Sequence, residues 1–154
     1  MKTILQFTFL ISLVLSVTNC GKTDYESIYL EDIPANKYYS KDNMPDSLTN
    51  IYGTWKFIAS SGGFHGGGYG KDFDYLVLKK NCIFGVIRND SLIAYGKLLL
   101  KPDNGGMLCI FDPDRSAEIE LCYDNEKYLD LNKDTLNLNA PCCDRYNIYL
   151  IREK

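Results

Sequence analysis

Short runs of alternating apolar and polar residues fill the chain from Ile51 onward and predict an all-β domain. The runs cover residues 55–59, 75–78, 83–88, 92–101, 107–111, 118–123, 128–131, 135–138 and 145–151. Turn-forming residues separate these nine runs, one of which we expect to be part of a bent or split strand. No stretch repeats its apolar positions every 3.6 residues, as a helix would. Short connections favour antiparallel neighbours, and closure leaves no exposed edge, so we expect an up-and-down barrel of about eight strands.

The first twenty residues have a different pattern. Lys2 precedes an apolar run over residues 4–15, and small or polar residues then lead to Cys20. The order of charge, short apolar core and small residues is typical of an export signal. The core is too short to span a bilayer, which requires about 20 apolar residues. We therefore expect residues 1–19 to be a signal peptide.

The segment Val17-Thr18-Asn19-Cys20 resembles the lipobox of bacterial lipoproteins. Asn19 stands where Gly, Ala or Ser is usual, a looser pattern found in lipoproteins of the Bacteroidetes. The resemblance implies that Cys20 carries lipid and attaches the protein to a membrane of the cell envelope, expected to be the outer membrane. Ordinary secretion, with Cys20 as one more thiol, is the alternative. Residues 20–50 then form the lipid anchor and a tether, since they are polar and proline-interrupted, and residues 51–154 form the barrel domain.

Charge excludes one class of partner. The chain has a formal charge of −3, and removal of residues 1–19, which contain Lys2 and no carboxylate, takes it to −4. Nucleic-acid binding calls for a basic face, so we expect no nucleic-acid partner.

The first strand of the predicted barrel begins with Gly53-Thr54-Trp55, and the last run is followed by Arg152. This arrangement resembles the lipocalins, in which a Gly-x-Trp tryptophan plugs one end of the barrel and an arginine from the last strand packs on it. Residues 51–74 and 134–146 look like the small lipocalin-like lipoproteins of Bacteroidetes. The resemblance implies that Arg152 stacks on Trp55 and that Arg145 lies at the opposite end. Because the chain is shorter than a typical lipocalin, its barrel either holds a ligand or is filled by its own aromatic side chains.

The glycine-rich segment 62–70 is the first candidate for chemistry. It places Phe64, His65 and Tyr69 at the predicted barrel mouth, where we expect them, with Tyr95, to contact a small apolar or aromatic ligand. A long mobile hairpin loop is the plainer alternative. A metal site formed by His65 with Asp72 or Asp74 is a further one, but one histidine and scattered carboxylates do not make a metal site, so no metal or cofactor is expected.

Five cysteines remain in the predicted mature domain besides Cys20. Cys109 and Cys122 are equidistant from the centre of the turn predicted at 112–117, so hairpin pairing places them opposite each other as a possible disulfide. Two small buried residues are the alternative. A bond between the adjacent Cys142 and Cys143 needs a strained turn, and one of them reaching another strand is preferred.

These features favour a binding protein over an enzyme. We expect a lipid-anchored envelope protein that holds a small apolar or aromatic ligand at the barrel mouth. The alternative is an envelope interaction protein or inhibitor with a filled barrel and an envelope protein as its partner. Catalysis finds little support, because any Ser-His-Asp or Cys-His arrangement must use His65.

Overall fold

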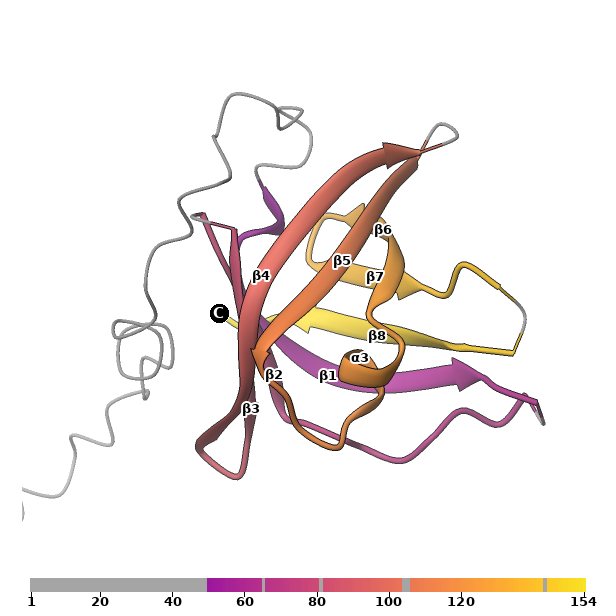
Figure 1. The fold of residues 1–154 in the computed structure, drawn as a ribbon, viewed down its shortest axis with the longest axis horizontal. Coiled ribbons are helices and arrows are strands. Elements are labelled where there is room, and N and C mark those ends of the chain that lie inside the picture. The colour runs from indigo at the N-terminus through magenta and orange to yellow at the C-terminus, as the bar shows by residue number, and fades with distance from the viewer. Residues whose placement is uncertain (1–49, 65, 81, 104–105, 143) are drawn as a thin grey trace, which may run out of the picture.

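Eight antiparallel strands form a closed barrel (Figure 1). This computed structural model describes residues 50–154 except 65, 81, 104–105 and 143. The strands are β1 (Gly53–Gly62), β2 (Tyr75–Lys79), β3 (Ile83–Arg88), β4 (Ser91–Asp103), β5 (Gly106–Arg115), β6 (Glu126–Asn132), β7 (Thr135–Asn139) and β8 (Tyr146–Arg152). A short helix, α3 (Glu120–Tyr123), lies between β5 and β6. The predicted signal peptide, Cys20 and nearly all of the tether lie outside the described residues.

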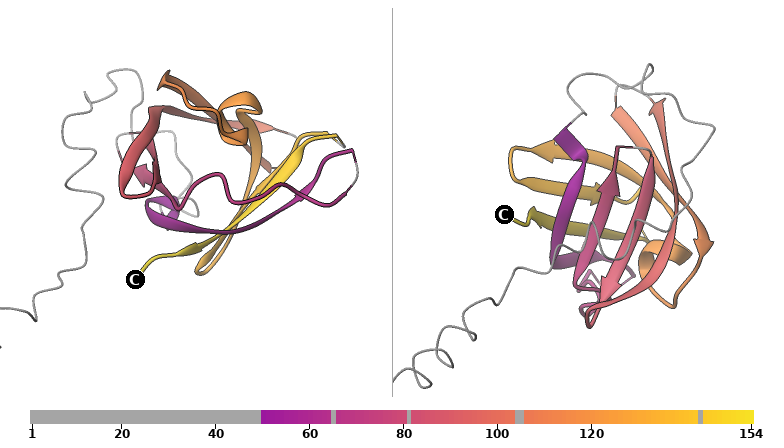
Figure 2. Two further views of the ribbon diagram at one scale, coloured as in Figure 1. Left: turned by 90° about the horizontal axis from the view of Figure 1, so that it is seen from below. Right: turned by 90° about the vertical axis from the view of Figure 1, so that its left-hand side faces the viewer.

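The strand order follows the sequence around the whole ring (Figure 2). Each strand pairs with its neighbours in the chain, and β1 pairs with β8 to close the barrel, with Trp55 opposite Arg152 and Gly62 opposite Tyr146. The predicted up-and-down barrel of eight strands is confirmed, together with the architecture that the lipocalin resemblance implied. All eight strand pairings lie within residues 53–152, so we expect this part of the chain to fold as a unit.

Two predictions around residues 112–123 are wrong. The predicted turn at 112–115 is the end of β5, which pairs with β4 as far as Arg115 opposite Tyr95. A register shift between Tyr95 and Gly96 accommodates Pro113, which lacks a backbone donor. The predicted strand at 118–123 is instead a connection containing α3, which buries Leu121. Its first four residues therefore alternate in polarity without pairing in the sheet.

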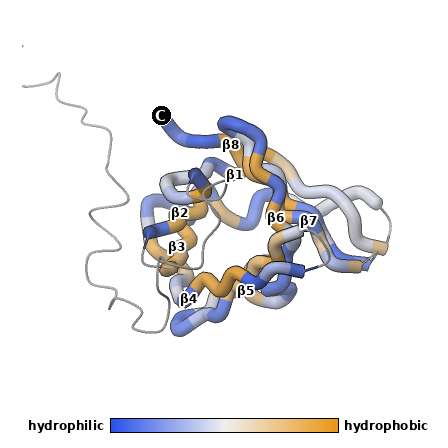
Figure 3. Tube along the Cα trace, turned by 90° about the horizontal axis from the view of Figure 1, so that it is seen from above, coloured by the Kyte–Doolittle hydropathy of each residue, from blue (hydrophilic) through white to orange (hydrophobic). Residues whose placement is uncertain are grey.

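Apolar and polar residues alternate along the strands (Figure 3), and apolar side chains form the core of the barrel. One contiguous core includes Trp55, Leu76, Phe84, Leu98 and Ile148, each with an exposed fraction of 0%. Phe84 and Phe111 meet edge to face, with ring centroids 5.2 Å apart. A cavity that admitted water would leave exposed surface on the side chains lining it. We conclude that these core side chains pack closely against one another.

One end of the barrel, where β1 begins and β8 ends, is closed by Trp55. We call it the Trp55 end and define it as residues 50–53, 79–82, 101–106, 132–134 and 151–154. The indole Nε1 donates to the Ile51 carbonyl at 2.7 Å, and the Arg152 guanidinium lies over the ring, 4.2 Å from its centroid. Arg152 also donates to the carbonyl oxygens of Tyr52 and Asn50. The predicted contact between Trp55 and Arg152 is therefore present.

Gly53 is required at this end for two geometric reasons. Its φ is +133°, and a Cβ atom there would lie 2.9 Å from Nη1 of Arg152. Any other residue would be strained and would displace the guanidinium from Trp55. The Gly-x-Trp pattern and Arg152 thus form one structural unit.

Candidate functional site

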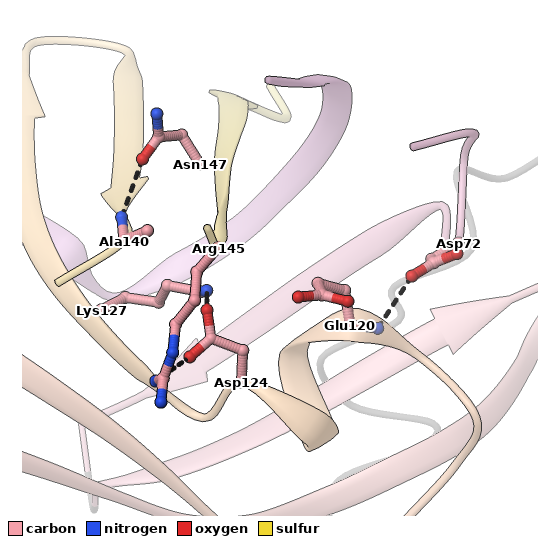
Figure 4. A network of polar contacts seen from close by, with 7 residues as sticks. All are labelled: Asp72, Glu120, Asp124, Lys127, Ala140, Arg145 and Asn147. Atoms are coloured by element: carbon pink, nitrogen blue, oxygen red, sulfur yellow. Dashed lines mark hydrogen bonds and ion pairs between the residues drawn. The ribbon is translucent and has the colours of Figure 1, made fainter. Parts of the chain in front are cut away.

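The opposite end of the barrel holds a buried polar cluster (Figure 4). We call it the Asp124 end and define it as residues 62–74, 88–91, 113–127 and 140–146. Asp124 is 6% exposed, and the Lys127 side chain beside it is 0% exposed. One carboxylate oxygen of Asp124 pairs with Lys127 Nζ and the other with the Arg145 guanidinium, whose side chain is 44% exposed. A single carboxylate thus joins β6 to the residue that precedes β8, and Arg145 lies at the end of the barrel that the sequence predicted.

Local structure explains how these three residues meet. Lys127 lies opposite Cys109 of β5, which belongs to the core, so its side chain is on the inner face of the barrel. Asp124 follows α3, and its backbone N–H donates to the Glu120 carbonyl at 2.8 Å. Arg145 is held by its carbonyl, which accepts from Gly63 N–H at 3.2 Å. The buried Lys127 cation is therefore neutralised by a carboxylate at the end of α3, and Arg145 from a loop pairs with the same carboxylate.

A second pair of carboxylates borders this cluster. Asp72 accepts a hydrogen bond from the backbone N–H of Glu120 at 2.8 Å and thereby ties the segment before β2 to α3. Burial raises the pKa of Glu120, and the neighbouring Asp124 and Asp72 carboxylates raise it further. Glu120 thus holds a proton more readily than an ordinary glutamate does.

Tyr69 contributes a buried hydroxyl to the same region. Its backbone is fixed by Ser60, whose Oγ accepts from Tyr69 N–H and donates to the Tyr69 carbonyl, both at 2.8 Å. Its ring meets Tyr146 edge to face, with centroids 4.9 Å apart. The hydroxyl has no hydrogen-bond partner among the described residues. Burial raises its pKa, as do the Asp72, Glu120 and Asp124 carboxylates, so it remains a donor.

The four predicted ligand contacts do not line one pocket. Phe64 is 86% exposed, Tyr69 packs on the core, and His65 lies outside the described residues. Tyr95 lies opposite Gly85, and the neighbouring pair of Phe84 and Gly96 faces the core, so Tyr95 is on the outer face of the barrel. Its predicted place at the barrel mouth is wrong, because a strand position next to an inward residue points outward.

Backbone hydrogen bonds fold the glycine-rich segment back onto the barrel. Gly66 N–H donates to the Gly63 carbonyl at 2.9 Å, and Gly68 N–H donates to the Gly62 carbonyl at 3.1 Å. Together with the bonds from Ser60 to Tyr69, these contacts fix both ends of the segment against β1. They also leave the exposed Phe64 ring on its outer side.

The predicted disulfide between Cys109 and Cys122 is wrong. Both cysteines are free, and Cys109 faces Lys127 across the ladder, not Cys122. Cys122 lies in α3, because the connection between β5 and β6 is not the simple hairpin on which the prediction depended. The alternative of two apolar side chains packed in or against the core holds for this pair. Cys82 and Cys142 are also free, while Cys143 lies outside the described residues.

Asp72 and Asp74 stabilise loops, while His65, the third residue of the alternative metal site, lies outside the described residues. Asp74 accepts from Asn89 N–H at 2.7 Å and pairs with Lys71 at 2.5 Å, and the hydrogen bond from Lys71 lowers its pKa. The described residues contain no group of three or more potential metal ligands.

The surface of the Asp124 end is acidic and carries exposed aromatic side chains. Phe64 and Tyr123 are 86% and 72% exposed. Nine carboxylates and five cations give the described residues of this end a formal charge of −4. The carboxylates are Asp72, Asp74, Asp90, Asp114, Glu118, Glu120, Asp124, Glu126 and Asp144, and the cations are Lys71, Arg88, Arg115, Lys127 and Arg145.

One feature of the sequence indicates the buried cluster, although the hydrophobic runs alone do not reveal it. Lys127, Leu129 and Leu131 occupy alternate positions of β6, and both leucines pack against the core. A lysine in phase with core leucines predicts a buried cation, which in turn requires a nearby carboxylate. The carboxylate that pairs with Lys127 could not be predicted in this way, because Asp124 and Arg145 lie in connections between strands.

The described part of the chain has no helix long and apolar enough to cross a membrane. Comparisons with protein family models, with curated proteins and with solved structures find no significant match.

Proposed function

We propose that this protein is a lipid-anchored interaction protein of the bacterial cell envelope, whose barrel displays a recognition surface at the Asp124 end. The anchor part of the proposal is supported by the export-type pattern of residues 1–19 and by the lipobox-like segment that ends at Cys20. An inhibitor and a subunit of an envelope complex both fit this description.

The packed barrel interior is the observation that carries the proposal. Fourteen of the 18 buried core side chains, among them Trp55 and Leu150, have an exposed fraction of 0%. A barrel that holds a small apolar ligand keeps room for it between these side chains, whereas a barrel that serves as a rigid support does not. The packing therefore favours recognition by the loops over binding inside the barrel.

The surface chemistry of the Asp124 end favours a protein partner with positive charge. Large exposed aromatic side chains are enriched where proteins bind each other, and Phe64 and Tyr123 are of this kind. The formal charge of −4 at this end speeds association with a cationic surface. We expect this association to weaken as salt concentration rises.

A small ligand at the barrel mouth is the second candidate. It is favoured by the buried Tyr69 hydroxyl, which is a hydrogen-bond donor without a partner among the described residues. A ligand with a hydrogen-bond acceptor would fit this hydroxyl.

Site-specific photo-crosslinking in the native cell envelope separates the candidates. A benzoylphenylalanine at position 123 should give a discrete protein adduct, whereas the same residue at position 151, at the Trp55 end, should not. Ile151 is a matched control, since it is 42% exposed on the opposite end. Equal adducts from both positions, or a small molecule released from the purified protein in native mass spectrometry, would contradict the proposal.

A further inference from the structure

The two ends of the barrel carry opposite charge. The described residues of the Trp55 end include six cations and three carboxylates, a formal charge of +3. The cations are Lys79, Lys80, Lys101, Lys133, Arg152 and Lys154. The Asp124 end carries −4, so the barrel is an electric dipole along its axis.

Local contacts leave part of the positive charge at the Trp55 end unpaired. Asp134 pairs with Arg152 and Lys154, at 3.9 and 3.6 Å, and Asp103 accepts a hydrogen bond from the Tyr128 hydroxyl. Lys80, Lys101 and Lys133 are exposed and form no ion pair with the described residues. Lys80 and Lys133 lie in two different connections and Lys101 lies near the end of β4, so the three lysines spread the charge over the end.

The chain enters the barrel at this same end. Asn50 precedes β1, and its carbonyl accepts a hydrogen bond from Arg152. The proposed tether and lipid at Cys20 therefore continue from the basic end. The charge at each end of the barrel then decides which end meets the membrane.

Because salt screens charges over a short distance, the charge of the barrel end nearest the membrane dominates the interaction with the membrane. A seven-residue strand such as β8 spans about 18 Å along the axis, at about 3.3 Å per residue and a tilt of about 40°. That length exceeds the Debye length of about 8 Å in physiological salt. A membrane in contact with the Trp55 end therefore feels its positive charge and only weakly the negative charge beyond it.

We propose that the Trp55 end binds an anionic phospholipid surface, so that the Asp124 end points away from the membrane toward its partner. This inference rests on the proposed lipid anchor. Membrane-proximal lysines interact favourably with anionic lipids, and the acidic end is repelled by them. Two features together give this orientation: the opposite charges of the two barrel ends and the entry of the chain at the Trp55 end.

The first test uses the unlipidated chain from Gly21 and phosphatidylcholine vesicles with and without phosphatidylglycerol. The wild-type chain should float with the anionic vesicles, and added salt should release it. Replacing Lys80, Lys101 and Lys133 by Gln should lower partitioning by about a hundredfold. The matched control replaces Lys56, Lys71 and Arg115, which are exposed elsewhere, by Gln and should partition almost normally. Trp55 fluorescence verifies that every variant is folded.

The second test uses the complete lipidated protein in the same vesicles. An amine-reactive label read by mass spectrometry should modify Lys71 in both vesicle types but should spare Lys80, Lys101 and Lys133 when phosphatidylglycerol is present. Equal partitioning of the two triple variants, absence of binding to anionic vesicles, or uniform labelling would overturn the orientation. Such results would leave lipidation of Cys20 and crosslinking from position 123 intact. Loss of lipidation or of that crosslink would instead count against the proposed function.

Discussion

Replacing Asp124 by Asn isolates the energetic role of the buried cluster. The substitution keeps the size of the side chain but removes the negative charge between Lys127 and Arg145. The two cations differ in their environment, because the side chain of Lys127 is 0% exposed and that of Arg145 is 44% exposed. Water solvates Arg145 in the variant, whereas Lys127 is left as a buried charge without a counterion.

The expected loss of stability is large for a barrel of this size. Breaking a buried ion pair by removing one partner costs about 3–5 kcal/mol. A small domain has a total stability of about 5–15 kcal/mol, and each kcal/mol shifts its melting temperature by about 4–8 °C. Asp124→Asn should therefore lower the melting temperature by at least about 12 °C.

The complementary substitution should cost much less. In Lys127→Met, Asp124 keeps its pair with Arg145 and the methionine fills the apolar space of the lysine, so we expect a loss below about 1.5 kcal/mol. The double variant Asp124→Asn/Lys127→Met contains no unpaired buried charge. It should recover most of the stability that Asp124→Asn loses.

Urea unfolding followed by Trp55 fluorescence measures all three variants, because Trp55 is the sole tryptophan and is fully buried. Two outcomes would refute the reasoning: Lys127→Met as damaging as Asp124→Asn, or a double variant no more stable than Asp124→Asn alone. Either would mean that the cluster acts through packing and not through compensation of a buried charge.

Three further predictions use the same assay. Arg152→Met should cost about 2–4 kcal/mol, since it removes the cation–π contact and two hydrogen bonds to carbonyls, whereas Arg115→Met at an exposed position should cost little; similar losses would contradict this role. Gly96→Ala should cost at least about 1–3 kcal/mol, because its Cβ would lie 2.1 Å from the Asp112 carbonyl oxygen, and Gly70→Ala, with nothing within 4 Å, is the control that should leave the urea midpoint nearly unchanged. Asp74 and Glu120 should respond to pH in opposite directions. The lowered pKa of Asp74 means that its stabilising effect is present above 3.8 and lost as pH falls through the folded-state value, so Asp74→Asn should destabilise near neutral pH and lose its effect in acid. The raised pKa of Glu120 means that ionisation costs stability above the folded-state value, so Glu120→Gln should stabilise near neutral pH and have little effect below 4.5; parallel pH profiles of the two variants would show that this sign is wrong.

The local alternation of apolar and polar residues was enough to predict the fold, because the strands that pair in the barrel are mostly neighbours in the sequence. Alternation identified the eight strands, and the turn residues between them implied antiparallel pairing, which the register confirms. The same logic failed at residues 118–123, where alternation came from a connection that buries Leu121 without joining the sheet. Polarity alone does not distinguish a strand from an irregular segment that packs on a core.

The candidate site was less predictable because it depends on contacts between distant segments. The contact between the motif Gly53-Thr54-Trp55 and Arg152 could be predicted, since both lie in regular strands whose ends must meet. Asp124 and Arg145 belong to connections, and only the three-dimensional path of those connections brings them to Lys127. Tyr95 was misplaced for a simpler reason, because the side of a strand on which a residue lies depends on a register that the sequence leaves open.

The pairing of β1 with β8 sets a condition on how the molecule can mature. Seven of the eight strand pairings join consecutive segments and can form as soon as both segments exist, but the eighth joins residues about a hundred positions apart, as the bond from Arg152 to Tyr52 shows. Until β8 exists, β1 presents an unpaired edge and Trp55 lacks its covering arginine. The barrel therefore closes only once β8 is available to pair with β1. A chain without β8 is an open sheet, vulnerable to proteases and to pairing with other chains.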